Sequence, residues 1–196
     1  MRIISEHSLR FFNLWLLMVL YVFPILLTII LRKRIFQPTS SRFSRSRSPR
    51  EYNIFVTSKI LMLIYFLYAI VIPIHYDTSS SIIGLIIYFF GFALYSAAWI
   101  TIAISEKGKV FTRGPYRFSR HPIYISSAVQ FIGAGLISQS WFYLGISIVV
   151  AISHLHNAFA EEHICIETFE DEYKNYMAIT PRWVGCPAQS KQFDIS

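Results

Sequence analysis

The chain has 196 residues, of which 54% are hydrophobic, 17% aromatic and only 15% charged, and its mean hydropathy is +0.46. Soluble domains carry roughly a quarter charged residues, so this composition excludes an ordinary soluble domain, and the aromatic content excludes a disordered chain. Two cysteines, Cys165 and Cys186, are too few for a disulfide scaffold. The formal net charge of +7 raises the question of nucleic-acid binding, which the placement of the charges answers.

Four long stretches of the chain contain no charged side chain. Residues 11–31 come close to the roughly 20 needed to cross the hydrocarbon core of a bilayer, and residues 60–76 and 78–105 form two further segments. Residues 122–160 are too many for one crossing, and we expect them to turn at 138–140. The sequence therefore predicts an all-α polytopic membrane protein with about five transmembrane helices, the last two forming a helical hairpin.

The basic residues predict the orientation of these segments. Of the 18 Lys and Arg residues, 16 fall in residues 32–59, in residues 107–120 and in the C-terminal tail, whereas the short linkers between the other segment ends contain none. Because basic loops remain in the cytoplasm, we expect the N-terminus, with Arg2 and Arg10, outside and the basic loops and C-terminus in the cytoplasm. Arg32-Lys33-Arg34 directly follows the first segment without a small-residue cleavage site, which indicates a retained anchor rather than a signal peptide.

The predicted membrane topology also indicates the roles of the Arg/Ser-rich run, the cysteines and the paired histidines. The Arg/Ser-rich run 40–50 lies in a loop between two spans, where it favours orientation and attraction to anionic lipid headgroups over nucleic-acid binding. Both cysteines are expected in the reducing cytoplasm, so we predict no disulfide. His154 and His156 are two apart on a helix and point to different faces, so we predict no metal site.

Two polar clusters stand at the two ends of the predicted hairpin. His121 precedes Pro122, which suits the first turn of a helix, so free backbone amides and the positive end of a helix dipole lie beside the imidazole. At the other end, Asn157 shares a helix face with Glu161, and Glu162 follows. Each cluster alone is typical of a helix cap or a solvated helix end. Because a hairpin returns its ends to one side, we expect the clusters to meet and hold a small zwitterion or cation.

The C-terminal part is expected to form an amphipathic cytoplasmic helix that ends before Pro181. Its acidic side would be drawn to the basic loop 107–120, so that the two together would roof the site. Gly133 and Gly135 are predicted to permit close helix packing. We interpret residues 1–196 as a single membrane domain: three N-terminal spans with the basic loop 32–59 in residues 1–104, a cofactor-binding region in 105–184 and a tail in 185–196.

Residues 105–184 resemble a known group of membrane enzymes. Gly114-Pro115-Tyr116, Arg120-His121-Pro122-Ile123-Tyr124, Glu161-Glu162 and the run 169–176 are similar to the isoprenylcysteine carboxyl methyltransferases and the related phospholipid methyltransferases. The resemblance implies transfer of a methyl group from S-adenosylmethionine to a lipophilic acceptor that enters from the bilayer. It also implies cofactor contacts at Gly108, Lys109, Val110, Phe111, Tyr116, His121, Pro122, Ile123, Tyr124, Glu161 and Glu162.

One position departs from this pattern. Asn157 stands where the prenylcysteine enzymes place an arginine that is thought to hold the substrate carboxylate, and we expect Asn157 to contact the substrate here. A neutral amide cannot supply a charged bidentate clamp, so the acceptor is left open between a prenylcysteine carboxylate and a phospholipid amine. An amine would have to lose a proton, with which His154 or His156 could assist, and no catalytic residue is assigned. An NADPH-dependent sterol-type reductase, disfavoured by Ile123, and a non-enzymatic scaffold are the rival interpretations.

Overall fold

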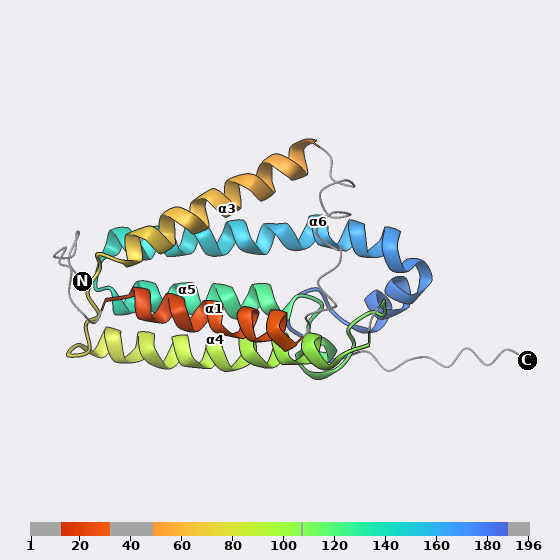
Figure 1. The fold of residues 1–196 in the computed structure, drawn as a ribbon, viewed down its shortest axis with the longest axis horizontal. Helices are drawn as coiled ribbons and strands as arrows, with labels where there is room; N and C mark the ends of the chain where they lie inside the picture. The colour runs from red at the N-terminus through yellow and green to blue at the C-terminus, as the bar shows by residue number, and fades with distance from the viewer. Residues whose placement is uncertain (1–12, 32–48, 107, 188–196) are drawn as a thin grey trace, which may run out of the picture.

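The computed structural model describes residues 13–31, 49–106 and 108–187, and within these ranges the chain is helical. The elements are α1 (Trp15–Leu31), α3 (Pro49–Ala69), α4 (Ser79–Ile104), the short 3₁₀ helix η1 (Gly114–Arg117), α5 (Pro122–Ile137) and α6 (Trp141–Ile179). The helices run along a common long axis, with α3 inclined to the others (Figure 1). The predicted all-α fold is confirmed for this part of the chain.

The helices have the length and surface of membrane-embedded elements. In the described ranges α3, α4 and α6 are long and apolar enough to cross a bilayer, and α1 and α5 are shorter apolar helices of 17 and 16 residues. Large apolar side chains point outward along them, among them Ile86, Phe90 and Ile152, each more than 60% exposed. Soluble monomers rarely expose such continuous apolar surface, so the protein is an integral membrane protein.

The second predicted segment was placed wrongly. Residues 60–76 were expected to be the span, but α3 occupies Pro49–Ala69 and the residues that follow form a loop. A helix continuing through Pro73 would bring the proline ring against the carbonyl of Ala69, four residues earlier. The apolar loop instead binds the start of α1, where the Leu14 N–H donates to the Ile72 carbonyl at 2.9 Å. Residues 49–59 of the predicted basic loop are therefore helical, while residues 32–48, Arg2 and Arg10 lie outside the described residues.

The hairpin turns where the sequence predicted. Helix α5 ends at Ile137 and α6 begins at Trp141, with Gln139 in the left-handed region at φ 55°. The predicted packing role of the glycines is also confirmed. A Cβ atom on Gly133 would lie 2.7 Å from the backbone nitrogen of Tyr88 in α4, and one on Gly135 would lie 2.7 Å from a Leu144 side-chain carbon in α6. These glycines therefore allow α5 to approach both of its neighbours closely.

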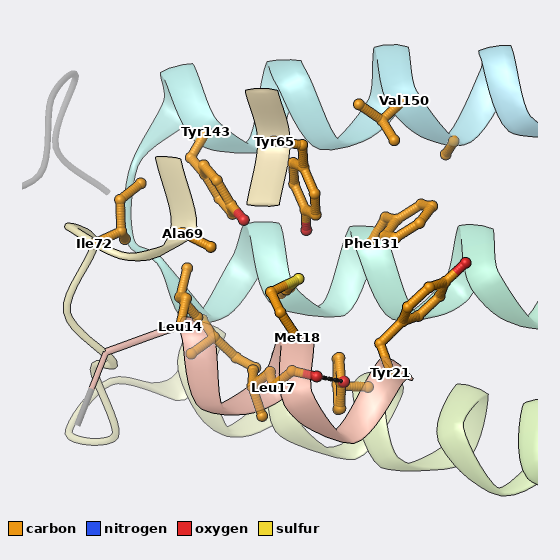
Figure 2. Close-up of a cluster of buried hydrophobic side chains, with 14 of the residues drawn as sticks. Leu14, Leu17, Met18, Tyr21, Tyr65, Ala69, Ile72, Phe131, Tyr143 and Val150 are labelled. Atoms are coloured by element: carbon orange, nitrogen blue, oxygen red, sulfur yellow. Dashed lines mark hydrogen bonds between the residues drawn. The ribbon is translucent and has the colours of Figure 1, made fainter. Parts of the chain in front are cut away.

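Aromatic rings fill the centre of the bundle. The Tyr65 ring of α3 stacks on the Tyr143 ring of α6 with centroids 4.8 Å apart, and it also meets the Phe131 ring of α5 edge-on at 5.3 Å. Tyr21 of α1 lies 5.4 Å from the same Phe131 ring, so this ring joins three helices in the core drawn in Figure 2. The core therefore fixes α5 and α6 relative to the N-terminal helices.

Helix α6 is longer than one membrane crossing needs. Its 39 residues are interrupted at Glu170, where φ 46° and ψ −119° break the helix and turn the last part back, as Figure 1 shows. Residues 141–160 contain no charged side chain and would span about 30 Å, which matches the hydrocarbon thickness of a bilayer. We therefore place the membrane-spanning part of α6 at 141–160, with Glu161 and later residues beyond it. The helix ends at Ile179, before Pro181 as predicted.

Candidate functional site

The two polar clusters of the hairpin meet at one end of the bundle. The C-terminal end of α4, η1, the start of α5 and the far end of α6 all lie at this end (Figure 1). The Nε2 atom of His121 is 3.1 Å from Oε1 of Glu162, and its Nδ1 atom is 3.8 Å from Oε2 of Glu161. The expected proximity of the two clusters is therefore confirmed, and one imidazole lies between two carboxylates.

Glu162 is the buried centre of an ion cluster. Only 3% of its side chain is exposed, and Arg182 donates to its Oε2 atom from Nε at 3.0 Å and from Nη2 at 2.6 Å. Nη1 of Arg120 lies 3.3 Å from Oε1. Burial alone would raise the pKa of Glu162, but hydrogen bonds from His121 and Arg182 and the charge of Arg120 outweigh it and lower the pKa to about 2. The carboxylate is therefore ionised and its oxygens are held by protein groups.

Arg120 brings a buried positive charge with donors to spare. Its side chain is 9% exposed, and within the part of the chain that the structure describes neither Nε nor Nη1 has a hydrogen-bond acceptor in good geometry. The backbone N–H of Arg120 donates to the Pro181 carbonyl at 3.0 Å, which holds Arg120 against the segment that follows α6. A buried guanidinium with unused donors is suited to an anionic ligand.

Glu161 differs from its neighbour in being accessible. It is 32% exposed, and within the described ranges its ion-pair contact is the long one, 3.8 Å, to Nδ1 of His121. The buried phenol of Tyr116 lies close enough to be affected, because burial first and the Glu161 charge second raise the pKa of Tyr116 well above its usual value. Burial likewise raises the pKa of the Cys165 thiol. The Tyr116 phenol and the Cys165 thiol therefore stay protonated. Because Glu161 is partly exposed whereas Glu162 is buried, Glu161 is the carboxylate that a ligand can reach.

The segment after Pro181 completes the site, and sequence reasoning missed it. Ser119 Oγ donates to the Arg182 carbonyl at 3.1 Å, and the Arg182 side chain reaches Glu162 from this segment. The Trp183 ring lies 6.3 Å from His121 and 6.1 Å from Phe159. An arginine and a tryptophan directly after a helix-ending proline were the available signal, but no helical periodicity links Arg182 to Glu162.

The loop residues expected to contact a cofactor lie in two places. Tyr116 is buried beside Phe111, with ring centroids 5.7 Å apart, whereas Gly108 and Lys109 are exposed. The Val110 N–H donates to Glu172 at 3.0 Å, so this loop rests on the last part of α6. Tyr176 OH donates to the Tyr116 carbonyl at 2.6 Å. The last part of α6 therefore contacts this loop, and the expectation that the two together roof the site stays a prediction.

The start of α5 orients the remaining predicted residues. The backbone N–H of His121 donates to Ser119 Oγ at 3.0 Å, and Pro122 and Ile123 form the first turn. The Tyr124 ring lies 5.7 Å from the His121 ring and faces α6. Asn157 is 4% exposed, and its Nδ2 atom donates to Ser58 Oγ of α3 at 2.9 Å. The predicted substrate residue therefore joins α6 to α3, one turn of helix inside Glu161.

Other candidate sites lie elsewhere or lack ligands. An apolar groove of about 580 Å³ is lined by residues of α1 and α3, among them Trp15, Phe23 and Phe66, and by Ile70 directly after α3, and its lining includes nothing from the hairpin. Groups of three or more His, Cys, Asp or Glu side chains that could hold a metal ion do not occur among the described residues. The His121 cluster, by contrast, brings ionisable groups from both ends of the hairpin together.

Comparison with known proteins supports the resemblance noted from the sequence. Residues 92–172 match the family model described as phospholipid methyltransferase. The match runs from the middle of α4 to just beyond the break in α6, and so includes His121, Glu161 and Glu162 but not Arg182. No curated protein matches the chain in a sequence search.

Proposed function

We propose that the phospholipid methyltransferase domain at residues 92–172 transfers the methyl group of S-adenosylmethionine to a lipophilic acceptor in the bilayer. The observation that carries this proposal is the position of His121 between two carboxylates and beside the unused donors of Arg120, where the span of α6 ends. Burying ionisable groups away from water is costly, and clusters of them are frequent at functional sites, which supports this proposal. The cofactor would reach it from the cytoplasm.

The residues present fit this cofactor. Arg120 offers N–H donors to the carboxylate of the methionine moiety, and the amides at the start of α5 add positive potential. Glu161 accepts from the ammonium group or the ribose hydroxyls. The aromatic faces of Tyr116 and Tyr124 attract the sulfonium. When bound, the cofactor supplies an electrophilic methyl group, and the protein supplies the alignment.

The paired carboxylates then have different tasks. Glu161, which is accessible, contacts the cofactor. Glu162 orients His121 and Arg120 through its hydrogen bond and ion pairs, while Arg182 fixes Glu162 from the other side. Methyl transfer from a sulfonium is a direct displacement, so alignment and exclusion of water account for most of the protein's contribution. Gly108, Lys109 and Val110 extend the site toward the cytoplasm along the loop that the last part of α6 covers.

The acceptor is proposed to enter sideways from the lipid and to meet Asn157 inside the span. Asn157 offers a neutral amide, and the family match is to phospholipid methyltransferases, so a lipid amine is favoured over a prenylcysteine carboxylate. We also propose that the N-terminus lies outside, that the basic loops and C-terminus are cytoplasmic, and that the basic loops attract anionic headgroups. No nucleic-acid partner is proposed.

Calorimetry on the purified full chain in detergent tests the proposal. S-adenosylhomocysteine should bind and NADPH should not. Glu161→Gln and His121→Ala should each weaken S-adenosylhomocysteine binding by about tenfold or more, equivalent to about 1.4 kcal/mol. Glu167→Gln, which neutralises an exposed carboxylate on the same helix, should leave the affinity unchanged. Binding of NADPH alone would assign a reductase, and retention of full affinity in both site variants would remove the site assignment.

A further inference from the structure

A second histidine, His154, lies deeper in the same hairpin with an unused polar atom. Its side chain is 8% exposed, and within the described ranges its Nε2 atom has no hydrogen-bond partner. A buried polar atom without a partner costs about 1–3 kcal/mol, so such atoms in folded proteins call for an explanation. His156, by contrast, is exposed on the other side of the helix.

His154 belongs to a polar stripe that leads inward from the cofactor site. His154, Asn157 and Glu161 occupy positions i, i+3 and i+7 of α6 and therefore share one helix face. Seven residues correspond to about 10 Å along the axis, which places the imidazole inside the hydrocarbon region. Ionisable side chains at such a depth are expensive, and they mark substrate or proton pathways.

One tyrosine links this histidine to the site. Tyr124 lies edge-on to His154 with ring centroids 4.7 Å apart, and it also lies 5.7 Å from His121. The Phe131 ring of α5 also lies edge-on to the imidazole, with ring centroids 6.0 Å apart. The titratable groups that face His154 are Tyr124 from α5 and, through its charge, Lys59 from α3. Within the described ranges no carboxylate pairs with His154, so a positive charge on this buried ring would be costly, whereas its unpartnered Nε2 atom can accept a hydrogen bond.

Resting on the proposed methyl transfer, we propose that His154 contacts the acceptor group and takes its proton. The acceptor nitrogen forms a bond to the methyl carbon, while the carbon–sulfur bond of the sulfonium breaks and its electron pair stays on sulfur. The proton of the acceptor N–H moves to Nε2 of His154 and later leaves to water. A carboxylate acceptor would carry no such proton and would be repelled by the lone pair, so the assignment selects an acceptor that bears an N–H group.

The test begins with a readout that needs no turnover. The full chain labelled with ¹⁵N in its histidine rings is titrated in detergent with dodecylamine and, separately, with dodecanoate. Dodecylamine should shift the Nε2 resonance that His154→Gln removes and leave the resonance that His156→Gln removes in place, and dodecanoate should shift neither. An unchanged His154 resonance, or equal shifts at both histidines, would overturn the proposal.

Activity then separates a proton acceptor from a packing residue. With an amine lipid as acceptor, His154→Gln should lower the rate by about 10²–10⁴-fold near pH 7, with partial recovery at high pH where free amine is abundant. His156→Gln should retain the wild-type rate and pH profile, and S-adenosylhomocysteine affinity should be unchanged in both variants. A wild-type pH profile in His154→Gln would refute the role. Absence of S-adenosylhomocysteine binding in wild type would instead refute the proposed function and leave the dodecylamine result standing.

Discussion

Glutamine substitution of Glu162 should mainly lower the stability of the fold, whereas glutamine substitution of Glu161 should mainly weaken cofactor binding. Glu162 is 3% exposed and holds Arg182 at 2.6 and 3.0 Å and His121 at 3.1 Å. Glu162→Gln keeps the shape but removes the charge and sets an amide against these donors. Breaking a buried pair costs 3–5 kcal/mol, and the partial exposure of Arg182 lowers the expectation to about 2–4 kcal/mol. Glu161→Gln, at an accessible site with a 3.8 Å contact, should cost less than about 1 kcal/mol.

The assay is reversible unfolding of the purified full chain in mixed detergent micelles, followed by circular dichroism, together with S-adenosylhomocysteine binding to the folded protein. Glu162→Gln should shift the unfolding midpoint strongly, whereas Glu161→Gln should unfold like wild type and bind the cofactor product weakly. Equal stability of the two variants would refute the assignment of a structural role to Glu162 and a binding role to Glu161. So would full binding by Glu161→Gln.

Three further outcomes follow from the packing and the ion cluster. Gly133→Ala should destabilise the fold by about 1–3 kcal/mol, since its Cβ would lie 2.7 Å from the α4 backbone. The control Gly145→Ala, whose Cβ would have nothing within 4 Å, should be neutral or stabilising. Equal unfolding midpoints of the two variants would contradict the close approach of α5 to α4. Tyr176→Phe should cost about 1–2 kcal/mol by leaving the Tyr116 carbonyl without its donor, and should speed proteolysis of the loop; unaltered cleavage would count against the roof. Folding lowers the pKa of Glu162 from 4.5 to about 2, so its ionised carboxylate adds roughly 3 kcal/mol to the free energy of unfolding above pH 4.5. This contribution is lost as the pH falls toward 2. An acid titration of stability should show the loss in wild type and not in Glu162→Gln.

The elements that the sequence predicted well are those with sharp chemical boundaries. The hairpin turn at 138–140 is polar between apolar runs, and α4 begins within one residue of the expected position because Thr78 caps it. The second span was misplaced because residues 70–76 are apolar without being helical. Hydropathy measures transfer into lipid, and it does not record the backbone restriction that Pro73 imposes on Ala69.

The site was predicted as far as hairpin geometry allows. Two ends of a hairpin must meet, so the pairing of His121 with Glu161 and Glu162 followed from the sequence. Arg182 could not be found this way, since it reaches Glu162 only after the break at Glu170 reverses the chain. A positive φ at a glutamate has no sequence signature, because glycine or asparagine would be expected there. The different exposure of two adjacent carboxylates likewise depends on tertiary packing.

Cofactor binding at the end of the hairpin can be located by photolabelling. The purified full chain is irradiated with methyl-tritiated S-adenosylmethionine, digested and mapped by mass spectrometry, with excess unlabelled S-adenosylhomocysteine as competitor. We expect competable label in the peptides that contain residues 108–124, 154–165 or 181–184. Competable label confined to the α1 and α3 residues that line the apolar groove would place the cofactor there and contradict binding at the hairpin.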